Sequence, residues 1–417
     1  MIDENILTDN LKNCRNWTKE GTLMNYLFSE HTKHYKSSAV RDILNVIQQG
    51  NIISFAGGLP SDDYFPIEAV QNAYEKVFAS GKASLQYGLT EGFKPLREAI
   101  QTVMKQKGIE SSVDKILLTT GSQQVIDLFS RVMLSDGDVV LTEDPTYLAA
   151  LQVFRSYGAN VVAVNGDEDG MDPVDLEEKM KMYKPKFVYI VPTFSNPDGK
   201  VWSAERRQKL VELCYQYNVL TLEDDPYGEL KFSDEVHHPV ASYDTNKTHV
   251  LYTSTFSKTV VPALRTGWVT GPSEVIAMIA QAKQMTDLHS SSLDQQALYF
   301  IMRDFDIQNH IQVLRNEYYQ RMTIMRDYLN KLEPGLFKWQ EPKGGMFMWI
   351  EGEEDLDVTK LLNDAVQNGV AYVPGSPFYV GEPKLNTFRL NFSHSTPDNI
   401  RLGMDRLLSV LINKVSV

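Results

Sequence analysis

The fold class is decided by two stretches of sequence, VLTLED (Val219–Asp224) and VLYTST (Val250–Thr255). Each is short and rich in apolar residues, and polar residues follow it at once. Five similar runs surround them: KILLTT (Lys115–Thr120), VVLTE (Val139–Glu143), NVVAVN (Asn160–Asn165), FVYIVP (Phe187–Pro192) and GWVTG (Gly267–Gly271). Continuous apolar runs are typical of strands that are buried on both faces of a sheet. The sequence therefore predicts an α/β fold with a mainly parallel, seven-stranded sheet.

Outward from these strands, the chain divides into a large and a small part. Helical stretches such as Ala204–Tyr217 separate the strands, as in a sheet covered by helices. After Ser290 come long charged helices (Leu293–Leu332), then the strand-like runs MFMWI, VAYVP and FRLNF, a helix near Val358–Asn368 and a final helix from Pro397. We expect residues 1–54 to form an N-terminal arm and part of a small domain. Residues 55–300 would form the large domain and residues 301–417 the small C-terminal α+β domain.

Composition excludes several classes of protein. The chain has 417 residues, of which 42% are hydrophobic, and this is ordinary for a globular protein rather than a disordered one. Its two cysteines, Cys14 and Cys214, imply neither a disulfide framework nor a metal site, and they fit a reducing cytoplasm. A net charge of −13 does not favour nucleic-acid binding. No apolar run is long enough for a transmembrane helix, and the acidic N-terminus does not resemble a secretory signal.

Polar residues follow four of the predicted strands. They are GSQQ (Gly121–Gln124), SNPDG (Ser195–Gly199), EDDPY (Glu223–Tyr227) and STFSK (Ser254–Lys258). In open α/β sheets, ligands bind at the carboxyl ends of the strands. We therefore expect these four segments to meet at one site.

STFSKTVVPALRTGW (Ser254–Trp268) is the most informative of these segments. A buried lysine has a lowered pKa and can form a Schiff base with a carbonyl group, which would be the role of Lys258. Thr255, Ser257 and Arg265 could hold a phosphate. The alternative is a surface lysine beside an ordinary turn, and a bare S-x-S-K pattern does not decide between the two.

The other segments allow a functional and a structural interpretation. Asp224 could pair with a pyridinium nitrogen and Tyr227 could donate to a phenolate oxygen, or EDDPY could be an acidic turn. The start of the helix at Ser122 could bind an anion, or Ser122 could be a plain N-cap. Tyr147 could stack on a flat ring or belong to the core. Asn196 could bond to a ring oxygen or only form an Asn-Pro turn.

Together with SFAGGLP (Ser54–Pro60), LQYGLTEG (Leu85–Gly92) and FRLNF (Phe388–Phe392), these motifs occur in the order seen in one enzyme family. Over roughly residues 39–410, the chain resembles the fold-type I, pyridoxal-phosphate-dependent class I/II aminotransferases. It is most similar to the subgroup of 2-aminoadipate and kynurenine/aminoadipate aminotransferases, whose catalytic domain is shared with MocR-type regulators. SAVRDILNV leading into SFAGGLP indicates the subgroup.

The resemblance implies a cofactor site in the large domain and assigns roles to its residues. Lys258 matches the lysine that bonds to the cofactor, Asp224 the aspartate on the pyridine nitrogen, and Tyr227 a donor to the ring hydroxyl oxygen. These three would be catalytic. The other residues implied in binding pyridoxal 5'-phosphate are Ser122, Gln123, Thr255, Ser257 and Arg265 at the phosphate, Tyr147 stacked on the ring, Asn196 at the ring hydroxyl, and Tyr87 from a neighbouring subunit. Thr255 stands where serine is commoner, but the hydroxyl is retained.

The same resemblance implies a substrate site and a homodimer with shared active sites. Arg389 matches the arginine that holds the substrate α-carboxylate, and Gly57, Asn196 and Arg41 lie where this subgroup meets the substrate. Arg41 could contact a distal carboxylate. Because Tyr87 would act across the interface, two copies of the chain are required. No metal is implied.

The implied activity is transfer of an amino group from an α-amino acid to a 2-oxo acid such as 2-oxoglutarate, in the cytoplasm. The donor would be 2-aminoadipate-like, aromatic or aliphatic. One alternative is a pyridoxal-phosphate-dependent lyase that catalyses β-elimination, since a fold does not fix a reaction. The other is a MocR-like regulator without its DNA-binding domain, which the acidic composition and the lack of a helix-turn-helix pattern before SFAGGLP disfavour.

Overall fold

The computed structural model describes residues 27–35 and 52–415 of the chain. Its α-helices are α3 (Ile67–Ala79), α4 (Lys94–Gln106), α5 (Ser122–Met133), α6 (Leu148–Ser156), α7 (Pro173–Tyr183), α8 (Ala204–Tyr217), α9 (Ser273–Asp287), α10 (Ser292–Asp304), α11 (Ile307–Leu329), α12 (Val358–Gln367) and α13 (Pro397–Val415). Its strands are β1 (Ile53–Ser54), β2 (Leu117–Thr119), β3 (Val139–Thr142), β4 (Asn160–Ala163), β5 (Gly166–Asp167), β6 (Gly170–Met171), β7 (Phe187–Ile190), β8 (Leu220–Asp224), β9 (Val250–Thr255), β10 (Gly267–Thr270), β11 (Phe337–Trp339), β12 (Phe347–Gly352), β13 (Val370–Ala371), β14 (Val373–Pro374) and β15 (Thr387–Asn391).

The seven predicted apolar runs form one central sheet, in the order β2-β10-β9-β8-β7-β3-β4. Strands β4, β3, β7, β8 and β9 pair in parallel. Strand β10 is antiparallel to both β9 and β2. The segment from β9 to β10 contains no α-helix, and parallel strands need a longer crossover, so β10 reverses direction. The prediction of an α/β fold with a mainly parallel sheet is confirmed.

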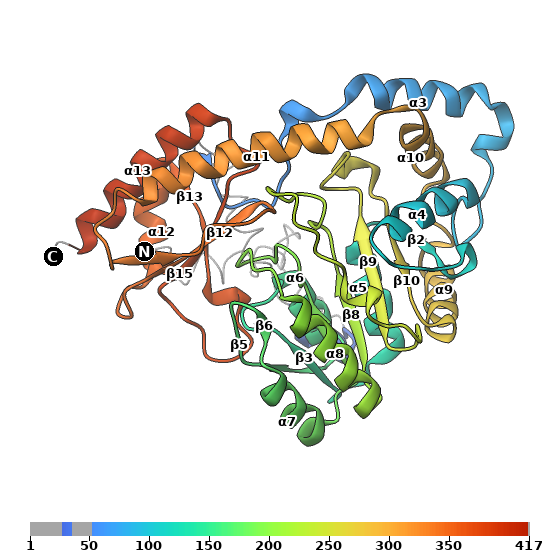
Figure 1. The fold of residues 1–417 in the computed structure, drawn as a ribbon, viewed down its shortest axis with the longest axis horizontal. Helices are drawn as coiled ribbons and strands as arrows, with labels where there is room; N and C mark the ends of the chain where they lie inside the picture. Colours follow the sequence, from blue (N-terminus) through green and yellow to red (C-terminus); the bar gives the residue numbers. More distant parts are fainter. Residues whose placement is uncertain (1–26, 36–51, 416–417) are drawn as a thin grey trace, which may run out of the picture.

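The central sheet is buried on both faces, which explains its continuous apolar strands. Leu117 and Leu251 belong to one core cluster with residues of α5, α6 and α9. Their neighbours Leu118 and Tyr252 belong to a second cluster with residues of α3, α4 and α10. Helices therefore flank the sheet on both sides (Figure 1). All four side chains are fully shielded from solvent.

Helix α8 illustrates how local sequence sets the limits of an element. The predicted range and the observed range, Ala204–Tyr217, are the same. The Ser203 side chain accepts a hydrogen bond from the Arg206 N–H, and this caps the first turn. Asn218 ends the helix in the left-handed conformation, which asparagine tolerates better than most residues.

A second, antiparallel sheet has the order β11-β12-β15-β14 and lies with α12 and α13 in the part of Figure 1 drawn in orange and red. The expectation of a single strand over VAYVP was wrong in detail. Val370–Ala371 pair with β1, whereas Val373–Pro374 pair with β15. Between them, the Tyr372 hydroxyl donates to the carbonyl of Val358 at 2.6 Å, so the chain changes sheets at this residue.

Helix α11 runs along both parts of the molecule (Figure 1) and fixes the segment that enters the large part. The N–H of Ser61 donates to the Tyr318 hydroxyl at 3.1 Å, and the Arg321 guanidinium donates to Ser61 and to the carbonyl of Ser393. The domain limits expected from the sequence stay a prediction, and residue 300 lies inside α10.

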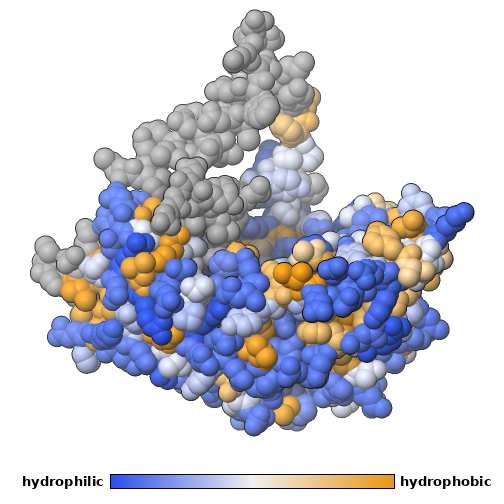
Figure 2. All heavy atoms as spheres, turned by 90° about the horizontal axis from the view of Figure 1, so that it is seen from above, coloured by the Kyte–Doolittle hydropathy of each residue, from blue (hydrophilic) through white to orange (hydrophobic). Residues whose placement is uncertain are grey.

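The face seen in Figure 2 is mostly hydrophilic, and hydrophobic side chains lie on it in small groups. No helix within residues 27–35 and 52–415 is long and apolar enough to cross a membrane. In the same residues, no three His, Cys, Asp or Glu side chains are grouped to hold a metal ion.

Candidate active site

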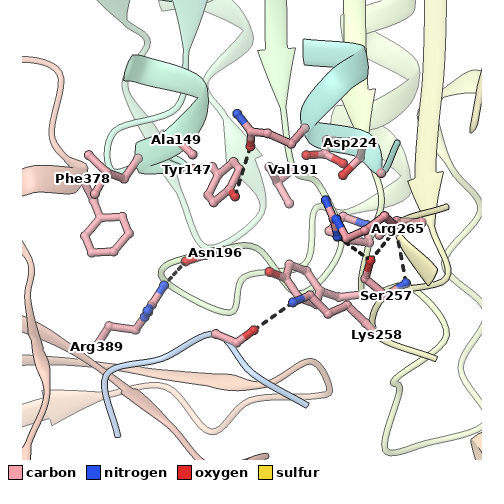
Figure 3. A pocket seen from close by; sticks show the side chains of 18 residues that line it. Tyr147, Ala149, Val191, Asn196, Asp224, Ser257, Lys258, Arg265, Phe378 and Arg389 are labelled. Atoms are coloured by element: carbon pink, nitrogen blue, oxygen red, sulfur yellow. Dashed lines mark hydrogen bonds between the residues drawn. The ribbon is translucent and has the colours of Figure 1, made fainter. Parts of the chain in front are cut away.

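A cavity of about 290 Å³ lies at the carboxyl ends of β7, β8 and β9 (Figure 3). Four segments that follow strands of the central sheet line it, as the sequence predicted. The lining residues are Gly58, Gly121, Ser122, Gln123, Tyr147, Leu148, Ala149, Val191, Asn196, Asp224, Pro226, Tyr227, Thr255, Ser257, Lys258, Arg265, Phe378 and Arg389. Arg389 comes from β15 of the second sheet, so the two parts of the molecule share the cavity.

Lys258 lies three residues beyond the end of β9, with its amine inside the cavity. Its Nζ donates a hydrogen bond to the carbonyl of Gly58 at 2.8 Å (Figure 3). Burial, together with the positive charges of Arg265 and Arg389, lowers the pKa of this amine to about 8, while Asp224 opposes the shift. A larger fraction of Lys258 is therefore neutral and nucleophilic at physiological pH than of an ordinary lysine.

Asp224 ends β8 and is fully buried, with one carboxylate oxygen in use. Its Oδ2 accepts a hydrogen bond from the Tyr189 hydroxyl at 3.1 Å, whereas its Oδ1 has no hydrogen-bond partner among the described residues. Burial raises the pKa of Asp224 to about 7, opposed by Tyr189, Ser122 and Lys258. A buried acceptor without a partner is costly, so Oδ1 is suited to a donor from a bound molecule.

An anion site is formed by the start of α5 and the turn after β9. Gly121 precedes the helix with φ +76°, and a Cβ there would lie 2.6 Å from Nη2 of Arg265. The Arg265 guanidinium donates to the Ser257 hydroxyl at 3.2 Å, and this hydroxyl lies 3.0 Å from that of Thr255. The free N–H groups of a helix start, hydroxyls and a guanidinium together suit a phosphate group.

Arg389 provides a second cation in the cavity. Its guanidinium donates to Oδ1 of Asn196 at 2.5 Å and to the carbonyl of Ala56 at 2.7 Å, and its Nε has no partner among the described residues. The group lies over the rings of Phe347 and Phe378. Burial lowers its pKa to about 10, so the charge is retained at neutral pH. Such a group suits a carboxylate.

Two tyrosines complete the wall of the cavity. The Tyr147 hydroxyl donates to Oε1 of Gln123 at 3.4 Å, and its ring lies between α5 and the Asn196 turn in Figure 3. Burial raises the pKa of Tyr147 to about 12. Tyr227 is buried against Phe347, with its pKa also raised by burial, so both phenols are neutral donors.

Comparison with known proteins identifies the family. Residues 50–407 match the family model described as aminotransferase class I and II. The chain is 38% identical over 391 residues to aromatic-amino-acid aminotransferase 1 of Thermococcus litoralis, covering 92% of this chain and 94% of the relative.

The chain belongs to the class I and II aminotransferases. It is 33% identical to the 2-aminoadipate transaminase of Thermus thermophilus, covering 91% of this chain and 95% of the relative. The crystal structure of the Pyrococcus horikoshii kynurenine aminotransferase, in complex with PMP, superimposes with a TM-score of 0.88 at 38% identity, covering 93% and 97% of the two chains. The expected fold-type I architecture and transaminase class are confirmed.

The residues of this aminotransferase fit pyridoxal phosphate. Oδ1 of Asp224 can accept from a ring nitrogen, the Gly121 turn offers room and donors for a phosphate, and the low pKa of Lys258 suits bonding to an aldehyde. In a chain of net charge −13, the cavity holds two arginines and a lysine against one aspartate. These local cations favour an anionic cofactor and substrate against the average field of the protein.

The structure brings together most of the residues predicted from the sequence. Those that line the cavity are Ser122, Gln123, Tyr147, Asn196, Asp224, Tyr227, Thr255, Ser257, Lys258, Arg265 and Arg389. Gly57 is buried and is not among the lining residues, whereas the next residue, Gly58, lines the cavity and accepts a hydrogen bond from Lys258, so the role of Gly57 stays a prediction. Tyr87 lies outside the cavity, exposed and edge-on to His289. Arg41 lies outside the described residues.

Sequence reasoning missed the apolar wall and one partner of Asp224. Leu148, Ala149, Val191 and Phe378 line the cavity, but nothing in their local sequence separates them from core residues. Tyr189 was detectable. It is a tyrosine inside a buried strand, and a buried hydroxyl requires a hydrogen-bond partner, which here is Asp224.

Proposed function

We propose that this enzyme transfers an amino group from an aromatic, aliphatic or 2-aminoadipate-like α-amino acid to a 2-oxo acid such as 2-oxoglutarate. One observation supports this most strongly. The Lys258 amine is buried at the same cavity as Oδ1 of Asp224 and Nε of Arg389, two atoms that have no hydrogen-bond partner in residues 27–35 and 52–415. A cofactor or an amino acid substrate can supply a carbonyl carbon for the amine, a hydrogen-bond donor for the carboxylate oxygen and an acceptor for the guanidinium.

Pyridoxal phosphate, when bound, supplies an electron sink for the carbanion that forms at the substrate α-carbon. We assign Asp224 to its ring nitrogen, because a carboxylate there keeps that nitrogen protonated. The phosphate would be held by Ser122, Gln123, Thr255, Ser257 and Arg265. Tyr227 and Asn196 would donate to the ring hydroxyl oxygen, and Tyr147 would cover the ring face.

Lys258 has two roles in this proposal. Its neutral Nζ would bond to the cofactor aldehyde in the resting enzyme. When it is free, Nζ would act as general base, taking the proton from the substrate α-carbon and delivering it to the cofactor carbon. A pKa of about 8 is suited to both directions of this proton transfer. The Gly58 carbonyl, at 2.8 Å, orients the amine when it is free.

Arg389 would bind the α-carboxylate of the substrate. The planar guanidinium can donate two parallel hydrogen bonds to a carboxylate, which an ammonium group cannot do. Asn196 and the Ala56 carbonyl already fix the orientation of this guanidinium. The substrate is thereby held with its α-carbon in a fixed position in the cavity, where Lys258 can reach it.

The cavity wall supports aromatic and aliphatic amino acids as amino donors. Leu148, Ala149, Val191 and Phe378 line the cavity with apolar surface, and the Phe378 ring lies under the Arg389 guanidinium. The three cations of the cavity are assigned to the aldehyde, the phosphate and the α-carboxylate. A distal carboxylate, as in 2-oxoglutarate, would therefore require Arg41 or another group, and we keep Arg41 as the candidate.

We further propose that the enzyme is a cytoplasmic homodimer with residues 55–300 as its cofactor-binding domain. An exposed apolar strip on the Tyr87 segment, formed by Leu85, Tyr87 and Leu89, supports a subunit contact there. Cys214 is a free buried thiol, as expected in a reducing compartment.

A panel of amino donors tests the proposed function. Each amino acid is mixed with the purified holoenzyme without any acceptor, and the cofactor spectrum is followed. We expect aromatic and aliphatic donors to convert the aldehyde form to the amine form, and 2-oxoglutarate to restore it. Release of ammonia and pyruvate from cysteine-type substrates, without conversion of the cofactor, would instead show the β-eliminating lyase.

A further inference from the structure

A fully buried lysine that the cavity does not use lies behind the phosphate-binding turn. Lys283 of α9 has no solvent-exposed surface. Its Nζ donates to both carboxylate oxygens of Asp287 at 2.7 and 2.8 Å, to Oε1 of Gln124 at 3.2 Å and to the Ser290 hydroxyl at 2.9 Å. A buried ammonium is costly unless it is paired and hydrogen-bonded, so this site is built around the charge.

Two partners of Lys283 hold the residue before the phosphate-binding turn. The N–H of Thr120 donates to Oε1 of Gln124 at 2.8 Å, and the Thr120 hydroxyl bonds to that of Ser290 at 2.8 Å. The Thr120 carbonyl accepts from Nη2 of Arg265 at 3.5 Å. Because Thr120 leads directly into Gly121 and Ser122, its position determines where the first N–H groups of α5 point.

The same network continues to the segment that carries Tyr87. The Ser290 carbonyl accepts a hydrogen bond from Nδ1 of His289, and Nε2 of His289 accepts from the N–H of Gly88 at 3.2 Å. The His289 ring is edge-on to the Tyr87 ring, with centroids 5.7 Å apart. Lys283 therefore connects the phosphate turn of its own subunit with the segment that would reach the neighbouring subunit.

We propose that Lys283 is a positioning residue for the cofactor phosphate, a role that rests on the proposed function and makes its phosphate site more specific. Lys283 touches neither the cavity nor the reacting atoms. It fixes Gln124 and Ser290, which fix Thr120 and thereby the donors of the Gly121–Ser122 turn. Through Ser290 and His289 it also orients the Tyr87 segment.

The variant Lys283→Met, which keeps the chain length and removes the charge, tests this role. Cofactor-free protein is titrated with pyridoxal phosphate, and separately with pyridoxal, which lacks the phosphate but retains the aldehyde and the ring. We expect the affinity for pyridoxal phosphate to fall about tenfold, as for a lost buried hydrogen-bond network, and the affinity for pyridoxal to stay within about twofold. A merely structural lysine would not discriminate between the two probes.

Two further variants make the test decisive. Lys179→Met is the matched control, because Lys179 pairs with Asp175 at 2.6 Å on α7 with the same i,i+4 spacing but far from the turn in sequence. It should leave both affinities unchanged. Gln124→Met removes the acceptor for the Thr120 N–H and should reproduce the selective loss even where Lys283→Met fails to fold.

The outcomes separate this inference from the proposed function. Unchanged binding of pyridoxal phosphate by both Lys283→Met and Gln124→Met, or an equal loss of pyridoxal binding, overturns the positioning role and leaves the proposed function intact. A wild-type protein that binds neither compound overturns both.

Discussion

The Lys258 amine has an environment that few lysines have. It is buried between two arginines, with one buried carboxylate to offset them, and its pKa is lowered to about 8. Only the neutral amine can bond to a carbonyl carbon. Burial, followed by the nearby positive charges of Arg265 and Arg389, lowers this pKa, while Asp224 opposes the shift.

The rate at which Lys258 bonds to pyridoxal phosphate should therefore depend on pH. Below the pKa, Lys258 is mostly ammonium, so the rate at which cofactor-free protein binds pyridoxal phosphate should rise about tenfold per pH unit. It should level off above about pH 8, where the amine is already neutral. Stopped-flow absorbance across this range measures the profile. A midpoint near 10.5, the ordinary value for lysine, would contradict the lowered pKa.

Substitution of Arg389 should weaken the binding of the substrate far more than the binding of the cofactor. Arg389→Ala should raise the activation free energy that corresponds to kcat/KM for amino donors by about 2–5 kcal/mol. The reason is that the buried α-carboxylate of the substrate would lose its charged partner. Arg389→Lys should recover only part of this loss, since an ammonium group cannot donate two parallel hydrogen bonds to a carboxylate. Steady-state kinetics give the loss, and retained binding of pyridoxal phosphate shows that the cofactor site is intact. Unaltered kinetics in Arg389→Ala would exclude it as the carboxylate group.

At the scale of elements, Lys107 at the end of α4 joins that helix to β8 and β9. Its Nζ lies 3.0 Å from Oδ2 of Asp225 and 3.1 Å from Oε1 of Glu229, and the Tyr252 hydroxyl also donates to Asp225. Asp225 is almost fully buried and directly follows Asp224. The ion pair of Lys107 with Asp225 thus helps to hold the turn that carries both Asp224 and Tyr227.

Lys107→Met should lower the free energy of unfolding by about 3–5 kcal/mol, because it leaves the Asp225 carboxylate buried without its cation. Urea denaturation of the cofactor-free protein measures this change. The double variant Lys107→Met with Asp225→Asn should regain a large part of the stability. A loss below about 1 kcal/mol, typical of a surface ion pair, would show that the pair does not hold the turn.

Elements of the central sheet could be predicted because each strand carries its own signal. A strand buried on both faces is rich in apolar and β-branched residues, so Phe187–Ile190 and Val250–Thr255 stand out in the sequence. The split of VAYVP at Tyr372 depends on pairing partners far away in the chain. Such long-range pairing leaves no local pattern to read.

The candidate site was predictable for a related reason. Side chains that follow buried strands converge at one edge of the sheet, so Asn196, Asp224 and Lys258 could be expected together. Gly57 and Gly58 could not be told apart from the sequence. Lys258 donates a hydrogen bond to the carbonyl of Gly58 because Tyr318 and Arg321 fix the position of this segment. Phe378 gives no signal in sequence, because it reaches the cavity from a separate turn after β14.

At the scale of the whole molecule, the proposed dimer places Tyr87 in the site of the other subunit. Within one chain, Tyr87 is outside the cavity and exposed, as this arrangement requires of a single subunit. A mixed dimer of one Lys258→Ala chain and one Tyr87→Ala chain should therefore have one complete active site. Neither variant dimer alone has a complete site.

Coexpression of the two variants with different affinity tags yields that mixed dimer. We expect its affinity for pyridoxal phosphate at one site, and its activity per intact lysine, to equal those of the wild type. If Tyr87 acts within its own chain, the one intact Lys258 of the mixed dimer lies in a site without Tyr87. The activity per intact Lys258 will then equal that of the Tyr87→Ala dimer, and a shared site is excluded.

The central claim is that the Lys258 amine bonds to the aldehyde of pyridoxal phosphate. The most direct test is to reconstitute the protein with the cofactor, reduce it with borohydride and locate the fixed label by peptide mass spectrometry. We expect one phosphopyridoxyl group per chain, on Lys258, and none in Lys258→Ala. A label on another lysine, or an unlabelled protein, would contradict it.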